Sequence, residues 1–183
     1  MTITISGVPG SGKSTVAGIV SKKLGLKHVS IGDLMRGLAA KKGVTLLEIS
    51  RLAEKDKSID EELDSSQMKL AGKDNLVVDS RLGFHFIPDS FKIFLDASPE
   101  EAGRRIFAAA RKLEKENISL KDTIENTKKR KESERLRYKK FYRLNPFDGA
   151  HYDLIIDTTK MMPDEVAGRI IAEVKKKYQH LKK

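Results

Sequence analysis

The chain reads Gly7-Val8-Pro9-Gly10-Ser11-Gly12-Lys13-Ser14 directly after an apolar run at residues 2–6 and at the start of a helical pattern at residues 13–24. Strand, glycine-rich loop and helix in this order are the context in which G-x-x-x-x-G-K-[ST] forms a phosphate-binding loop. The glycines let backbone N–H groups converge on a phosphate, and the positive end of the helix dipole adds to their effect. We therefore expect this loop and the following Thr15 to bind phosphates, with Lys13 reaching the outer ones and Ser14 ligating Mg²⁺. A glycine-rich turn that arose by chance is the alternative.

Further apolar runs bounded by Gly, Asp, Ser or Pro lie at residues 27–30, 75–79, 91–95 and 153–157. Helical patterns are found at residues 13–24, 33–42, 46–55, 59–71, 99–112, 120–141 and 163–178. Strands that alternate with helices indicate βαβ crossovers. The sequence therefore predicts an α/β fold with a five-stranded, mostly parallel sheet and helices on both faces.

The composition is that of an ordinary globular domain. At 183 residues, with 39% hydrophobic and 34% charged side chains, the chain is long enough for one domain and too short for two. No run approaches the length of a membrane helix and the N-terminus lacks a signal-peptide pattern, so we expect a cytosolic protein without a membrane segment. The chain has no Cys and its four His show no ligand spacing, so any metal must be held by oxygen.

The formal net charge of +10 is concentrated in one segment. Residues 104–143 hold 15 basic and 6 acidic side chains, whereas residues 1–103 hold 14 of each. Such a segment beside a neutral domain suits either an RNA-binding arm or a cap that closes over a polyphosphate. Arg130, Glu134 and Arg137 are spaced to share one face of the predicted helix, which would place two guanidiniums and a carboxylate together. A salt-bridged helix facing solvent is the alternative.

Charged side chains also follow two predicted strands, where ligands bind in parallel sheets. After the second strand, Asp33 can cap a helix that carries Arg36 one turn later. Asp79 ends the third strand, and Arg81 follows two residues later. A carboxylate at a strand end can hold the water shell of Mg²⁺, and a guanidinium nearby can meet a phosphate. A surface position on the helix is the alternative for Arg36.

Together these motifs resemble the nucleoside monophosphate kinases, and among them the cytidylate kinases, particularly a short archaeal-type group. The resemblance covers almost the whole chain. Besides the phosphate loop, it rests on Ser30-Ile31-Gly32-Asp33-Leu34-Met35-Arg36, Asp79-Ser80-Arg81, the Arg-rich segment and Tyr152-Asp153-Leu154-Ile155-Ile156-Asp157-Thr158. Departures fall where the base is read, at Ser65-Ser66 (in place of Arg-Arg), Ser80 (in place of Gly), Gly83 (in place of Ala) and Lys131 (in place of an acid).

The resemblance implies transfer of the γ-phosphoryl group of ATP to CMP, and also to dCMP, with Mg²⁺ as cofactor. An ionised phosphate is already a nucleophile, so alignment and charge neutralisation suffice without a general base. The implied single domain has a core of residues 1–36, 75–112 and 150–183. An insert at about 37–74 would bind the acceptor nucleotide, and a basic lid at about 113–149 would close over the site.

Residue roles follow from the same resemblance. Lys13 would hold the donor phosphates, Arg36 and Arg81 would grip the acceptor phosphate, and Asp79 would hold Mg²⁺ through water. The lid would bring in Arg130 and Arg137, with Arg135 as a weaker candidate. Contacts to the acceptor's base or ribose are expected from a further set, which consists of Ser30, Gly32, Asp60, Asp64, Gln67 and Glu134. Exposed positions on a helix are the alternative for Asp60 and Asp64.

Two other functions stay open. A sister kinase for AMP or UMP would share every phosphate-binding residue and differ only in the acceptor pocket. An RNA-binding P-loop NTPase would use the basic segment as an electrostatic arm, but no RNA-recognition signature accompanies it. The kinase interpretation carries the expectation of small-molecule nucleotides as partners, no nucleic acid, and a monomer rather than an assembly.

Overall fold

A parallel five-stranded sheet forms the centre of the protein in the computed structural model, which describes residues 1–109 and 119–179. The strands are β1 (Thr2–Gly7), β2 (Lys27–Ser30), β3 (Leu76–Asp79), β4 (Phe91–Asp96) and β5 (Leu154–Asp157). They lie in the order β2-β3-β1-β4-β5, and every neighbouring pair is parallel. Each strand agrees with a predicted one to within a residue at either end, so the predicted α/β class is confirmed.

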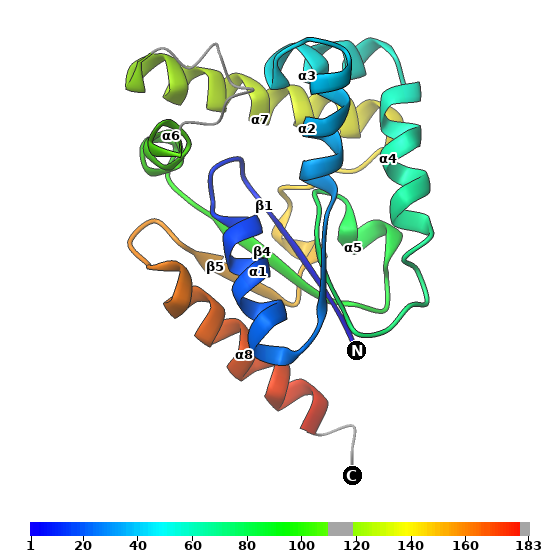
Figure 1. Ribbon diagram of the computed structural model, residues 1–183, viewed down its shortest axis with the longest axis vertical. Helices are drawn as coiled ribbons and strands as arrows, with labels where there is room; N and C mark the ends of the chain where they lie inside the picture. The colour runs from blue at the N-terminus through cyan, green and yellow to red at the C-terminus, as the bar shows by residue number, and fades with distance from the viewer. Residues whose placement is uncertain (110–118, 180–183) are drawn as a thin grey trace.

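Helices connect the strands (Figure 1). Their bounds are α1 (Lys13–Leu24), α2 (Ile31–Lys41), α3 (Leu46–Lys55), α4 (Ser58–Met68), α5 (Gly83–Phe86), α6 (Pro99–Ala108), α7 (Leu120–Tyr142), α8 (Pro163–Gln179) and the short 3-10 helix η1 (Gly149–His151). Neither α5 nor η1 was predicted, because four or three residues are too few to show a helical period. The predicted helix at 99–112 and the predicted lid at 113–149 extend into residues 110–118, which lie outside the described residues.

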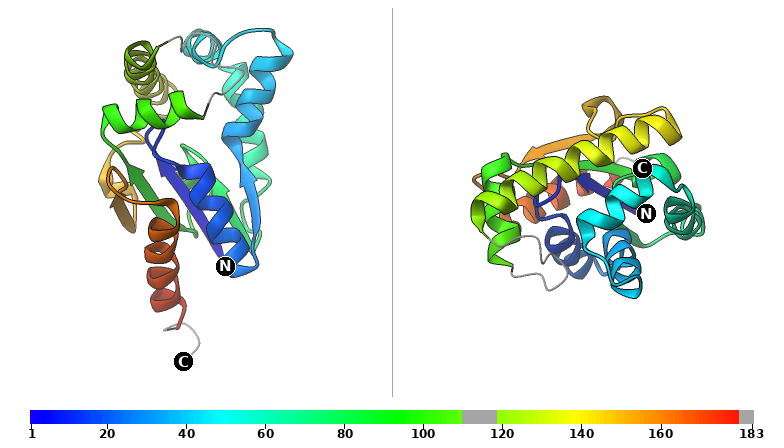
Figure 2. Two further views of the ribbon diagram at one scale, coloured as in Figure 1. Left: turned by 60° about the vertical axis from the view of Figure 1, so that its left-hand side comes forward. Right: turned by 90° about the horizontal axis from the view of Figure 1, so that it is seen from above.

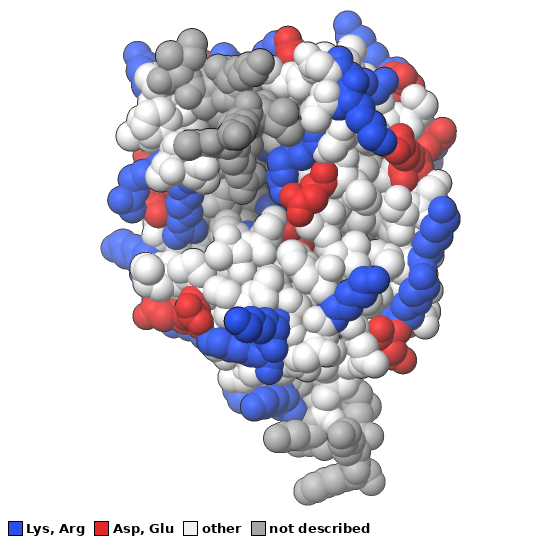
Figure 3. Space-filling view, in the orientation of Figure 1, with Lys and Arg blue, Asp and Glu red and all other residues white. Residues whose placement is uncertain are grey.

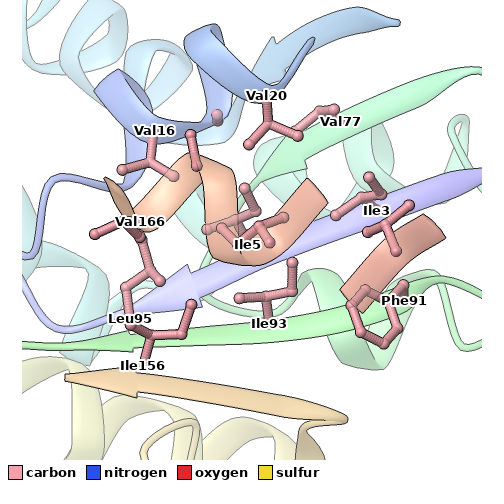
Figure 4. Close-up of a cluster of buried hydrophobic side chains, with 14 residues drawn as sticks. Ile3, Ile5, Val16, Val20, Val77, Phe91, Ile93, Leu95, Ile156 and Val166 are labelled. Carbon is pink, nitrogen blue, oxygen red and sulfur yellow. The ribbon is translucent and has the colours of Figure 1, made fainter. Parts of the chain in front are cut away.

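One face of the sheet packs against α1 and α8 (Figure 4). Alternate residues of the strands, such as Ile3, Ile5 and Ile93, point into this layer and are fully buried. Val16 of α1 and Val166 of α8 meet them from the other side. Burying one such aliphatic side chain contributes about 1.5–3 kcal/mol, so this layer is a main source of stability for the central strands.

Different helices cover the opposite face. Leu76 and Val78 of β3 belong to a second cluster that includes buried side chains of α2, α3 and α4. At the centre of this face α5 approaches β1 closely, since a Cβ atom on Gly83 would lie 3.1 Å from Thr4 Cβ. The prediction of helices on both faces is therefore confirmed.

The long helix α7 lies across the carboxyl ends of the strands, as the view from above in Figure 2 shows in yellow-green. It packs tightly on α6, because a Cβ atom on Gly103 would lie only 2.4 Å from Ile124 Cγ1. Toward its other end, Lys140 Nζ donates to the carbonyl oxygen of Glu54 in α3 at 3.0 Å. The space between α7 and the sheet is where ligands bind in parallel α/β folds. No helix in the described part of the chain is long and apolar enough to cross a membrane.

Candidate nucleotide-binding site

The loop between β1 and α1 has the backbone shape that the sequence motif requires. Gly10 adopts φ of 79°, and a Cβ atom there would lie 2.5 Å from the carbonyl oxygen of Ala102. Gly12 has φ of 86° and precedes α1, whose start is capped by no described side chain. The first N–H groups of α1 therefore remain for an anion, which also gains from the helix dipole. Val8 and Ser11 are buried and do not line the central cavity, and Ser11 Oγ donates to Val8 O at 2.9 Å.

Lys13 follows the loop and donates from Nζ to the carbonyl oxygen of Val8 at 3.0 Å. Burial lowers the pKa of Lys13 well below its usual value, and the neighbouring charge of Arg81 lowers this pKa further. A bound phosphate would oppose both effects, because an anion favours the protonated ammonium. The local electrostatics therefore favour an anionic ligand at Lys13.

A central cavity opens between the phosphate loop, α2, α4, the segment after β3, and α7. It brings together most of the predicted site residues: Pro9, Gly10, Gly12, Lys13, Ser14, Thr15, Gly32, Arg36, Asp60, Asp64, Gln67, Asp79, Arg81, Arg130, Glu134 and Arg137. Ser30 does not line this cavity but contacts Asp79, which does. Arg135 lies elsewhere, in an exposed pair with Glu132. Residues from distant parts of the sequence thus converge on one site.

The prediction that Asp33 caps a helix is wrong. The helix α2 begins two residues earlier, at Ile31, and its N-cap is Ser30, whose Oγ accepts from the backbone N of Asp33 at 3.2 Å. A serine is among the best N-caps, and its position at the end of β2 lets it serve both elements. Asp33 instead pairs with Arg36, whose Nε lies 3.1 Å from Asp33 Oδ1. This pair holds the Arg36 guanidinium at the edge of the central cavity.

Asp79 and Ser14 both line the central cavity and carry oxygen atoms that could hold a cation. Asp79 ends β3, is 2% exposed, and accepts from Ser30 Oγ at 3.1 Å. His28 Nε2 lies 4.0 Å from the same carboxylate oxygen. A carboxylate and a hydroxyl fit Mg²⁺, which takes few protein ligands and keeps several waters. Within residues 1–109 and 119–179 no cluster of three acidic or histidine side chains forms a metal cage. A cation here would therefore depend on substrate phosphates for further ligands.

Glu134 of α7 lies between two arginines. Arg81 contacts both oxygens of Glu134, through a short Nε contact and through Nη2 at 3.3 Å from Oε1, and its Nη1 donates to Gly7 O at 2.5 Å. Arg130 Nε lies 3.3 Å from Glu134 Oε1. Burial alone would raise the pKa of Glu134, but the charges of Arg81 and Arg130 outweigh it and lower this pKa to about 2. Glu134 therefore stays ionised and ties α7 to the core.

A second buried pair joins α7 to α4. Arg137 Nε lies 3.2 Å from Asp60 Oδ2, and neither atom has a hydrogen-bond partner among the described residues. Arg137 also donates to the carbonyl oxygen of Ser50 at 3.3 Å and to Tyr138 Oη at 2.9 Å. Burial raises the pKa of Asp60 to about 6, although the charge of Arg137 acts in the opposite direction. Both side chains face the central cavity, which contradicts the alternative of a solvent-facing helix at these positions.

Along α4, Asp60, Asp64 and Gln67 follow one another at helical spacing and are all buried. Asp64 Oδ2 accepts from the hydroxyl of Tyr142, and Gln67 Oε1 accepts from the hydroxyl of Ser80. These two partners were not predicted. Tyr142 lies on the same helix as Arg137, and Ser80 departs from the family pattern. Neither observation indicates which side chain the tyrosine or the serine contacts.

Solved structures of kinases share this architecture. A shikimate kinase from Bacteroides thetaiotaomicron superposes with a TM-score of 0.63 at 13% identity, covering 96% of this chain and 98% of that one. A gluconokinase from Sinorhizobium meliloti superposes with a TM-score of 0.64 at 14% identity, covering 98% of this chain and 94% of that one. At such identities the comparison shows the fold alone. The fold, the phosphate loop and the arginines that line the central cavity together define a P-loop kinase.

Similar sequences show which family of P-loop kinases the chain resembles. A family model described as an AAA domain matches residues 6–122. The cytidylate kinase of Archaeoglobus fulgidus is 42% identical over 96% of this chain and 97% of its own length, and that of Natronomonas pharaonis is 40% identical over 91% of this chain and 85% of its own length. The chain belongs to the cytidylate kinase family. The resemblance drawn from the sequence motifs is thereby confirmed.

Proposed function

We propose that this protein transfers the γ-phosphoryl group of ATP to CMP and dCMP, forming ADP and the corresponding diphosphate. The observation that carries this proposal is the convergence of positive charge on one cavity. Lys13 reaches it from the phosphate loop, Arg36 from α2, Arg81 from the segment after β3, and Arg130 and Arg137 from α7. Cytosine as the acceptor base is supported by the relatives that are cytidylate kinases.

A second cavity lies on the other side of the phosphate loop. Gly10, Gly12 and Thr15 line both cavities, and Arg105 and Met161 face only the second one. Two nucleotides could therefore meet at the loop, with the donor nucleoside in the second cavity and the acceptor in the central one. This arrangement supports transfer between nucleotides over hydrolysis of one.

In the proposed reaction, an oxygen of the acceptor phosphate forms a bond to the γ-phosphorus while the bond from that phosphorus to the β–γ bridging oxygen breaks. The acceptor oxygen is already ionised, so no side chain has to remove a proton from it. Lys13 and the loop N–H groups hold the β- and γ-phosphates, and Arg36 and Arg81 hold the acceptor phosphate in line. When bound by Ser14, and through water by Asp79, Mg²⁺ would neutralise charge on the donor phosphates.

The helix α7 covers the reacting groups. We propose that residues 113–149 act as the lid and residues 37–74 as the acceptor-binding insert. Arg130 and Arg137 then neutralise charge from above while the lid keeps water away from the γ-phosphorus. The buried contacts of Glu134 with Arg81 and of Arg137 with Asp60 support a docked position of α7 over the site.

The RNA-binding alternative is less well supported. Arg130, Glu134 and Arg137, in the most basic part of the sequence, face the central cavity instead of solvent. On the face shown in Figure 3, basic and acidic side chains are interspersed and do not form one continuous basic surface. An extended basic surface is what electrostatic binding of a nucleic acid would use.

The proposal is tested by measuring ADP formation from ATP and Mg²⁺ with CMP, dCMP, UMP, AMP or GMP supplied one at a time, and with total RNA as a control. We expect turnover with CMP and dCMP. Turnover with AMP or UMP instead would reassign the acceptor and leave the phosphate chemistry intact. Stimulation by RNA alone, or no acceptor-dependent ADP at all, would overturn the kinase proposal.

A further inference from the structure

Ser80 joins the segment after β3 to α4 through its hydroxyl group. Ser80 Oγ accepts from the backbone N of Leu82 at 3.2 Å and donates to Gln67 Oε1. Both side chains are buried, with Ser80 4% and Gln67 3% exposed. The Ser80 hydroxyl has one proton, which it donates to Gln67 Oε1, while the backbone N–H of Leu82 occupies one acceptor position of the same oxygen. The Gln67 amide is therefore held by its oxygen, which leaves its nitrogen as the group for a ligand in the central cavity.

The next polar group along this face of α4 is an acceptor. Asp64 lies one helical turn before Gln67, and both side chains line the central cavity. One Asp64 oxygen, Oδ2, accepts from Tyr142. The α4 wall thus presents a hydrogen-bond donor, Gln67 Nε2, beside a carboxylate acceptor.

Cytosine and uracil differ in this pair of groups. Cytosine has an acceptor at N3 beside a donor at N4, whereas uracil has a donor at N3 beside an acceptor at O4. The donor of Gln67 beside the acceptor of Asp64 on α4 complements cytosine and opposes uracil at both positions. With the Gln67 amide turned over, two acceptors would stand side by side, and the wall would no longer suit N3 of cytosine.

We infer that Ser80 is a positioning residue for base selection, because it fixes the Gln67 amide with its nitrogen toward the acceptor base. The inference rests on the proposed function and goes beyond it. It assigns the choice between cytosine and uracil to the hydrogen bond from Ser80 to Gln67, which acts on the base only through Gln67. Loss of one well-placed hydrogen bond in a selective site changes discrimination by about tenfold or more.

The test is steady-state kinetics of Ser80→Ala with CMP and UMP at saturating ATP and Mg²⁺. We expect the KM for CMP to rise about tenfold, the ratio of kcat/KM for CMP over UMP to fall about tenfold, and both the KM for ATP and kcat at saturating CMP to stay close to wild type. Ser21→Ala is the matched control. Ser21 is also buried, but its hydroxyl donates to a backbone oxygen within α1, Gly18 O, at 2.9 Å, away from the cavity.

A second variant separates positioning from a general packing defect. Gln67→Glu keeps the side-chain shape but presents only acceptors, so it should lose the preference for CMP even with Ser80 in place. In that background Ser80→Ala should not change the CMP to UMP ratio further. An unchanged ratio in Ser80→Ala, or independent multiplicative effects of the two substitutions, would overturn the inference. If the unsubstituted chain fails to phosphorylate CMP, the proposed function itself is wrong and this inference falls with it.

Discussion

Replacing Glu134 with Gln removes one negative charge from between Arg81 and Arg130 and leaves the size of the side chain unchanged. Glu134 is 4% exposed, so water cannot compensate the two guanidiniums that remain. Removing one partner of a buried ion pair destabilises a protein by about 3–5 kcal/mol. We expect Glu134→Gln to fall near the lower value, because the amide oxygen can still accept a hydrogen bond from Arg81.

The pKa of Glu134 gives a second measure of this energy. It is about 2 in the folded protein against an ordinary value of 4.5, a difference that corresponds to about 3 kcal/mol of stability at neutral pH. Because the folded-state pKa is the lower one, this stabilisation is complete above pH of about 4.5 and is lost as the pH falls toward about 2. The variant should lack this part of the pH dependence. In a chain of this size, 3 kcal/mol lowers Tm by about 6–12 °C.

The assay is thermal and urea unfolding of wild type, Glu134→Gln and Glu132→Gln. Glu132 is on the same helix, and its exposed pair with Arg135 makes it a matched control that should unfold much like wild type. ATP should raise the Tm of Glu134→Gln more than that of wild type, because the added phosphates restore negative charge beside the arginines. Equal stability of Glu134→Gln and Glu132→Gln would show that the buried charge of Glu134 does not stabilise the fold.

Further expectations concern the acceptor phosphate, the packing of α7 and the buried Asp60. Arg36→Ala should raise the acceptor KM about 10- to 100-fold with little change in Tm, because one charge-assisted hydrogen bond contributes about 1.5–3 kcal/mol to binding. Steady-state kinetics with the acceptor measure this effect, and Arg135→Ala is the control that should leave the acceptor KM unchanged. Gly103→Ala should lower the free energy of unfolding by about 1–3 kcal/mol, because the new Cβ would lie 2.4 Å from an atom of α7. Urea titration measures this change, and an unchanged free energy of unfolding would show that α6 and α7 can separate freely. Asp60 has a folded-state pKa of about 6 against an ordinary value of 3.8, so its ionisation lowers the free energy of unfolding as the pH rises between these two values. Asp60→Asn should remove this loss of stability. Equal pH profiles of unfolding for the variant and wild type would contradict the expectation.

Local patterns predicted much of the fold. The phosphate loop, the five strands and the long α7 each carry their signal within a few consecutive residues, as glycines, apolar runs or a helical period. The same period placed Arg130, Glu134 and Arg137 on one face, and the structure has all three on the central cavity. The alternation of strands and helices then left a parallel sheet as the consistent arrangement.

The contacts within the site could not be predicted in the same way. Arg81 and Glu134 are 53 residues apart in the sequence. The residues around either one do not indicate that the two side chains form a pair. The same holds for Gln67 and Ser80, which meet only because α4 folds beside the end of β3. The error at Asp33 has a local cause: serine and aspartate are both good N-caps, and the hydrogen bond from Asp33 N to Ser30 Oγ shows which one the helix uses.

In the proposed mechanism, a phosphoryl group passes from ATP to CMP in a cavity that keeps water out. Phosphorus NMR of a reaction containing the protein, ATP, Mg²⁺ and CMP tests it most directly, because each phosphate product has its own resonance. We expect CDP and ADP in equal amounts, without accumulation of inorganic phosphate. Inorganic phosphate and ADP without CDP would contradict it.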